Sequence, residues 1–111
     1  MSRNTESTDA LRNAAFLAKS LSDGNRLRIL QLIGEEEKSV SAIVEELTLS
    51  QPLVSHHLKE LKHSLLVRVQ CRGPFVYYQL SDPRVLEVVH TLNTIARDLL
   101  STQSTFNREG K

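Results

Sequence analysis

Five polar or basic side chains lie close together in the middle of the chain, at spacings that place them on one side of a helix. They are Gln51, Ser55, His56, Lys59 and Lys62, with Glu60 as the one acid among them. Their amide, hydroxyl, imidazole and ammonium groups can bond to phosphate oxygens and to the edges of bases. This chemistry predicts a surface that contacts DNA.

The helix that carries this surface is predicted over Leu49–Leu61. Ser50 is a good N-cap, and Pro52 is tolerated in the first turn, where backbone N–H groups have no helical partner. His57 lies about 100° around the helix from His56, so we expect it to pack against the preceding helix. The buried side of the helix is predicted to consist of Leu53, Val54, Leu58 and Leu61.

The neighbouring segments predict a helix-turn-helix followed by a β-hairpin. Residues 41–47 have the pattern of a short helix, and residues 48–50 separate it from the next one. Residues 67–71 alternate apolar and polar side chains, and residues 75–80 are rich in β-formers. Arg72 begins the Arg-Gly-Pro turn between these strands. A basic residue is therefore expected at the tip of the hairpin, where it could meet a phosphate.

Amphipathic helices are predicted on both sides of this unit. Thr8 can cap a helix over residues 9–21, Asp23 can cap a second, and a long apolar-striped helix covers residues 82–100. The outer helices carry more apolar surface than one small core needs, which predicts pairing with a second copy, although closure of the monomer core remains the alternative. The predicted dimer contacts are Leu11, Ala14, Leu86, Val89, Leu92, Ala96 and Leu99.

Length and composition favour a single small domain. The chain has 111 residues, 40% of them hydrophobic, which suffices for one core but not for two. We expect the domain to span residues 9–100, between flexible tails at residues 1–8 and 101–111. The fold class is mainly α with a small β-hairpin. No apolar run is long enough to cross a bilayer and the N-terminus is polar, so we expect a cytoplasmic protein with no membrane partner.

The net charge of +1 does not by itself indicate a nucleic-acid partner, but the distribution of charge along the chain is informative. Residues 51–75 carry four Lys or Arg and one acid, whereas residues 1–50 carry six Lys or Arg and eight acids. Positive charge is therefore concentrated on the predicted DNA-contacting helix and hairpin. A basic footprint of this size suits several phosphate contacts per subunit.

Four segments together resemble the ArsR, or ArsR/SmtB, family of bacterial winged-helix repressors. They are LSDGNRLRIL, LSQPLVSHHLKEL, the following LLV, and VYYQLSD. The resemblance implies a homodimer whose subunits have four helices, a β-hairpin and a fifth helix, and which occupies an operator until an effector weakens binding. It places operator contacts on Gln51, Ser55 and His56, the start of the recognition helix at Ser50, and a wing contact at Arg72. Lys59 and Lys62 are added from their chemistry.

The sequence departs from the family at its metal sites. The thiolate site of many members uses a CxC pair, and the matching residues here are Ser39-Val40-Ser41, whose hydroxyls are poor ligands for soft metals. We expect the second of these serines to cap a helix instead. The other family site has the pattern Asp-x-His followed by two ligands. Asp82 keeps the first position, but Arg84, Ile95 and Asp98 occupy the others, so we expect no metal and no cofactor.

The single cysteine excludes an internal disulfide and fits a reducing compartment. Within a strand, Cys71 is expected to pack as a small hydrophobe, and His90, which is off the ligand pattern, is expected to be structural. A sensing role for either residue stays open.

The sequence therefore predicts a homodimeric, winged helix-turn-helix DNA-binding regulator, most simply a repressor of a near-palindromic operator. It is not expected to be an enzyme, because the chain has no phosphate-binding loop, metal-ligand cluster or nucleophile in a recognisable setting. Two alternatives stay open: a protein-interaction module without DNA binding, and a metal- or redox-responsive repressor with a non-standard site. The effector, the operator sequence and the choice between repression and activation are not determined by these residues.

Overall fold

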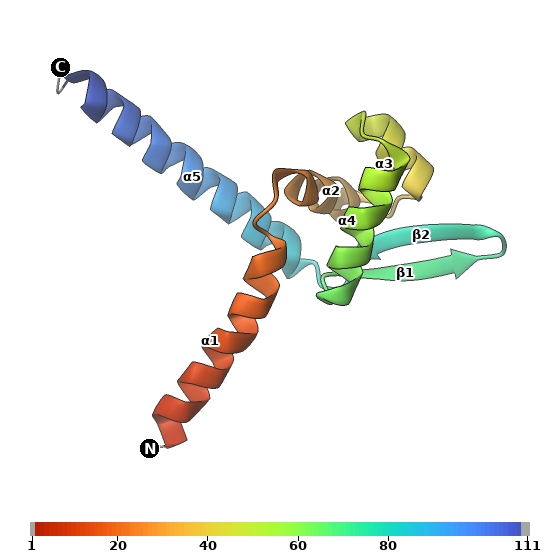
Figure 1. Cartoon of the computed structure of the whole chain (residues 1–111), viewed down its shortest axis with the longest axis horizontal. Helices are drawn as coiled ribbons and strands as arrows, with labels where there is room; N and C mark the ends of the chain where they lie inside the picture. Colours follow the sequence, from red (N-terminus) through yellow and green to blue (C-terminus); the bar gives the residue numbers. More distant parts are fainter. Residues whose placement is uncertain (1, 110–111) are drawn as a thin grey trace.

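The computed structural model describes the backbone of residues 2–109 and the side chains of residues 8–103. Over these residues the elements, in chain order, are α1 (Ser2–Ser20), α2 (Gly24–Glu35), α3 (Val40–Leu47), α4 (Gln51–His63), β1 (Val67–Arg72), β2 (Phe75–Leu80) and α5 (Arg84–Glu109) (Figure 1). The two strands pair in antiparallel fashion. This order confirms the predicted mainly helical fold with a β-hairpin between the fourth and fifth helices.

The core lies where α2, α3 and α4 meet the base of the hairpin. The largest side chains with less than 2% exposure are Ile29, Leu30, Ile43, Val54, Leu58 and Leu61. Those of α4 follow one another at helical spacing, as predicted, whereas Leu53 is only half-buried. This core holds α4 so that its opposite side faces solvent.

Serine and aspartate side chains define where the central helices begin. Asp23 accepts hydrogen bonds from the backbone N–H groups of Asn25 and Arg26, and Ser50 accepts one from Leu53, so both predicted caps are confirmed. The prediction that Ser41 caps α3 was wrong. The cap is Ser39, which has an extended backbone and accepts the N–H of Ala42 at 3.2 Å.

The hairpin is closed by a two-residue turn and attached to the helices by a bridge. Arg72 pairs with Phe75, which leaves Gly73 and Pro74 as the turn. Gly73 has φ +61°, whereas the ring of Pro74 restricts φ to negative values. A positive φ at only the first of the two turn residues is the pattern of a type II′ turn. Lys38 exchanges two backbone hydrogen bonds with Tyr78, of 3.1 and 2.8 Å, which ties the hairpin to the start of α3.

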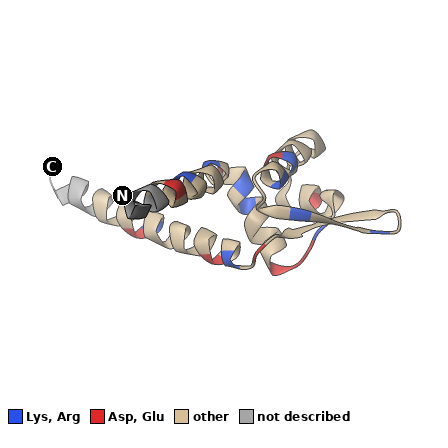
Figure 2. Ribbon diagram, turned by 90° about the horizontal axis from the view of Figure 1, so that it is seen from below, with Lys and Arg blue, Asp and Glu red and all other residues tan. Residues whose placement is uncertain are grey.

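Helices α1 and α5 project from the central unit in different directions, away from the hairpin (Figures 1 and 2). The radius of gyration is 17.3 Å, whereas a compact chain of this length would have about 13 Å. Both helices extend beyond the ends predicted for them. The helix α1 begins at Ser2 rather than at residue 9, and α5 ends at Glu109 rather than at Leu100. The predicted flexible tails lie largely outside the residues whose side chains are described. No helix in the described part of the chain is long and apolar enough to cross a membrane.

Candidate nucleic-acid interface

The structure brings the predicted DNA-contacting residues of α4 onto one accessible side of the helix. Gln51, His56, Lys59 and Lys62 are exposed, and Ser55 is half-buried. Gln51 Nε2 donates to Ser55 Oγ at 3.1 Å, so these two side chains share one patch across a single turn. The patch offers amide and hydroxyl groups at its start and two ammonium ions farther along. Such a surface can bond to base edges and phosphates.

His57 holds α4 against the beginning of α2. Its side chain is buried, its Nδ1 accepts a hydrogen bond from Arg26 Nε at 3.2 Å, and its Nε2 lies 3.7 Å from Asp23 Oδ1. Packing was predicted, but against the preceding helix α3 rather than α2. Burial lowers the pKa of His57, in opposition to Asp23, which favours the charged ring. The centres of the His56 and His57 rings lie 5.6 Å apart and their planes are inclined by 57°, but His56 is exposed whereas His57 is buried.

Arg72 lies beside the turn of the hairpin, as predicted, but its charge is engaged within the protein. Its guanidinium forms an ion pair with Glu37, which precedes α3, and lies 5.1 Å from the centre of the Tyr77 ring. The Arg72 side chain is still 55% exposed. No local pattern indicated Glu37, because this contact joins two distant segments.

Arg68 is a basic residue of the hairpin that the sequence reasoning missed. It is exposed on β1 and lies on the same side of the strand as Arg72, because side chains four residues apart in a strand share a face. Among the described residues it forms no ion pair. The alternation of β1 could have identified it.

The apolar residues of the terminal helices divide into an exposed set and a buried set. Leu11, Leu92 and Leu99 are 71%, 43% and 65% exposed, and Ala14 and Ala96 are exposed too. Of the other two predicted dimer contacts, Val89 is corrected because it belongs to the monomer core, whereas Leu86 is half-buried and stays a prediction. The helix α5 has apolar residues on two sides, one facing α2 and one facing solvent. Residues missed on the exposed side are Val88 and Ile95.

Comparison with known proteins places this fold in a family. The family model for bacterial regulatory proteins of the arsR family matches residues 23–69. A helix-turn-helix-type transcriptional regulator of Methanocaldococcus jannaschii, itself uncharacterised, is 35% identical over 83 residues, which are 74% of this chain and 93% of that protein. The chain belongs to the ArsR family. Since this is a family of regulatory proteins, the expectation that the chain is not an enzyme is confirmed.

Two further proteins resemble the chain over most of its length. The arsenical resistance operon repressor of Staphylococcus aureus is 35% identical over 79 residues, which are 71% of this chain and 76% of the repressor. The second is a homodimeric winged helix-turn-helix DNA-binding domain from Mycobacterium bovis, whose solution structure matches this one with a TM-score of 0.73 and 27% sequence identity. The match covers 82% of this chain and 84% of the Mycobacterium bovis chain. These similarities confirm the winged helix-turn-helix fold.

The side chains at the positions where the resemblance implies metal ligands have partners within the protein. The hydroxyl of Ser39 caps α3. Asp82 binds the guanidinium of Arg84, with its Oδ2 2.7 Å from Nη2, and these bonds lower the pKa of Asp82 to about 2. The same contact raises the pKa of Arg84. Across the described residues, no three His, Cys, Asp or Glu side chains are grouped closely enough to hold a metal ion.

Proposed function

We propose that this ArsR-family chain is a homodimeric, sequence-specific repressor that binds a near-palindromic DNA operator. The observation that carries the proposal is the exposed polar and basic side of α4, beside a core that fixes the helix from behind. Base readout is assigned to Gln51, Ser55 and His56. Contacts that position the protein on the phosphates are assigned to Ser50, Lys59, Lys62, Arg68 and Arg72.

Dimerisation is proposed to occur through α1 and α5. Both helices project from the central unit and carry large apolar side chains in contact with solvent, among them Leu11, Leu92 and Leu99. Apolar surface of this extent is typical of protein–protein contacts. The homodimeric state of the similar domain from Mycobacterium bovis supports this assignment. A two-fold axis would present two α4 helices to half-sites about 34 Å apart.

We also propose that repression is relieved without the family's metal sites. A carboxylate held by a guanidinium is a poor ligand for a dication, because Arg84 both occupies the Asp82 oxygens and repels the ion. The serine at the thiolate position offers a hydroxyl, which soft metals bind poorly. These contacts favour an effector of a different class, such as an organic ligand or a protein.

The test is selection of bound sequences from random duplex DNA by the full chain, without metal and with added zinc. A single palindromic motif, recovered under both conditions, is the expected result. The matched control is the double variant Gln51→Ala, His56→Ala, which keeps the ammonium groups of α4 and should lose the motif while retaining weak general binding. Loss of the motif with zinc would contradict the metal-independent mechanism. If the wild-type chain enriched no sequence, the proposal of specific DNA binding would be contradicted, and a protein-interaction role would be favoured.

A further inference from the structure

Leu65 has a backbone conformation that leucine rarely adopts. The helix α4 ends with hydrogen bonds from Leu66 N–H to the Leu61 carbonyl and from Leu65 N–H to the Lys62 carbonyl, both of 3.0 Å. This pair of bonds defines the Schellman motif, whose central residue is left-handed and usually glycine. Here that residue is Leu65, with φ +68°. The local backbone therefore favours glycine at a position that holds a large side chain.

The Leu65 side chain packs little against the described residues of the monomer. It is 71% exposed, although it is apolar. A Schellman motif is usually accompanied by a hydrophobic contact between a residue in the last turn of the helix and the residue after the left-handed one. Here Leu61 and Leu66 hold these positions, and their side chains are 0% and 4% exposed, so the contact does not involve Leu65. Leu65 is thus unfavourable in its backbone conformation and in its exposure to water. Both observations indicate that the side chain makes its contact outside the monomer.

The surroundings of Leu65 identify the surface that it belongs to. Leu65 lines a groove of about 640 Å³ between α1 and α5, together with Leu17 and Val88. Val88 is 50% exposed and begins the apolar side of α5 that continues through Leu92 and Leu99. The charged groups at the groove, Asp82 and Arg84, neutralise each other in a direct ion pair. The groove is therefore an uncharged, apolar continuation of the proposed dimer surface.

We propose that Leu65 is a dimer contact, and that its side chain packs against a second copy of this chain. The proposal rests on the homodimer proposed above and extends that interface from the two terminal helices to the end of α4. Because Leu65 directly follows α4 and its cap, the partner subunit would then hold the carboxyl end of the recognition helix. The interface would thereby help to fix the position of the residues that contact DNA.

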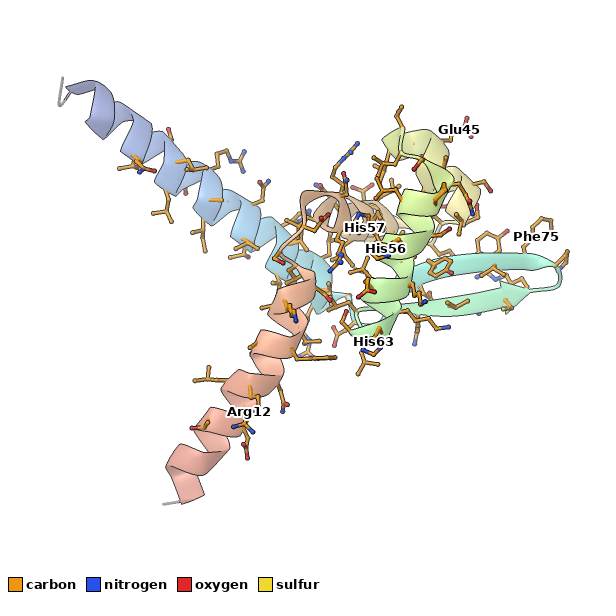
Figure 3. The ribbon with its side chains drawn as sticks, in the orientation of Figure 1. Arg12, Glu45, His56, His57, His63 and Phe75 are labelled. Atoms are coloured by element: carbon orange, nitrogen blue, oxygen red, sulfur yellow. The ribbon has the colours of Figure 1, made fainter. Side chains whose placement is uncertain are left out.

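The test compares the full-length variants Leu65→Ala and Leu65→Gly with the wild type by sedimentation velocity over a series of protein concentrations. Both variants lose the side chain, so both should raise the dimer dissociation constant at least tenfold. The matched control is Phe75→Ala, which removes a 61% exposed side chain from the outer end of the hairpin (Figure 3) and should leave dimerisation unchanged. Wild-type dimerisation in both Leu65 variants would overturn the proposal.

The same measurements separate this proposal from the homodimer itself. A wild-type chain that is monomeric throughout the series would overturn the homodimer and the Leu65 contact together. A dimeric wild type with unaffected Leu65 variants would overturn only the Leu65 contact. A second readout is the urea midpoint of the two variants at concentrations where both are monomeric. Leu65→Gly should unfold at higher urea than Leu65→Ala, because only glycine relieves the left-handed conformation, and the reverse order would contradict the strain argument.

Discussion

Replacing Glu37 with glutamine should strengthen DNA binding, because Glu37 neutralises Arg72 at the turn of the hairpin. The carboxylate forms an ion pair with the Arg72 guanidinium, and only 21% of the Glu37 side chain is exposed, whereas Arg72 is 55% exposed. A phosphate that approaches Arg72 from the solvent side therefore also meets the negative charge behind it. Glu37→Gln removes this repulsion and leaves a hydrogen-bonding group of nearly the same shape.

The size of the effect follows from the geometry of the pair. A phosphate on the outer side of the guanidinium would lie roughly 7 Å from the carboxylate, where two like charges in water repel by about 0.6 kcal/mol. The two subunits of a dimer together give about 1.2 kcal/mol, equivalent to about sevenfold in affinity. Screening at about 0.1 M salt removes roughly half of this energy. We therefore expect binding that is roughly threefold to sevenfold tighter.

The assay is fluorescence anisotropy with a labelled duplex that carries the selected operator, titrated with wild type and variant at several salt concentrations. The matched control is Glu36→Gln, which makes the same charge change at the adjacent residue, where the carboxylate lies 3.9 Å from the Lys38 ammonium and is 77% exposed. An equal gain in both variants would refute the role of the Glu37–Arg72 pair. A gain in affinity from Glu37→Gln that persists in combination with Arg72→Ala would also refute this role.

Three further predictions concern the helix-turn-helix. Gln51→Ala or Ser55→Ala should lower discrimination at individual base pairs by about 1–3 kcal/mol, whereas Lys59→Ala should weaken all sequences alike, as titrations of single-base operator variants at several salt concentrations would show. Thr48→Gly should raise the free energy of unfolding in urea by about 1 kcal/mol, since Thr48 is β-branched and has φ +54°; an unchanged or lower value would contradict this. The folded-state pKa of His57 is lowered from 6.5, so the unfolded state binds more protons as the pH falls below that value and the protein loses stability. His57→Asn should flatten the decrease in urea midpoint between neutral and acidic pH, and an equally steep decrease would count against the assignment.

The helix boundaries show where local sequence signals suffice and where they do not. Asp23 and Ser50 could be predicted as caps because each comes just before an apolar helical pattern, and a cap acts within three residues. Ser39 and Ser41 have the same capping chemistry, so the sequence could not choose between them. The choice depends on the pairing of Lys38 with Tyr78, which keeps the backbone before α3 extended. Forty residues separate these partners in the chain.

In the candidate site, too, some features could be predicted from local sequence and others depended on tertiary packing. The polar and basic side of α4 followed from helical periodicity, because the apolar residues at the intervening positions must face the core. Periodicity could not tell which apolar residues of α5 face the core and which face solvent, since the helix has both kinds. The tertiary structure decided this by packing α2 against Val89, which left Val88 and Ile95 exposed.

The sequence by itself determined the order of the elements, the starts of α2 and α4, the hairpin turn and the set of α4 side chains available to DNA. Each depends on residues only a few positions apart, whose caps, periodicity and turn chemistry act locally. Only the tertiary structure decided that Glu37 neutralises Arg72, that His57 binds Arg26 of α2, and that Leu65 stands exposed in a left-handed conformation. The two pairings join segments distant in sequence, and the exposure of Leu65 depends on how α1 and α5 leave the core. No pattern of neighbouring residues specifies such contacts.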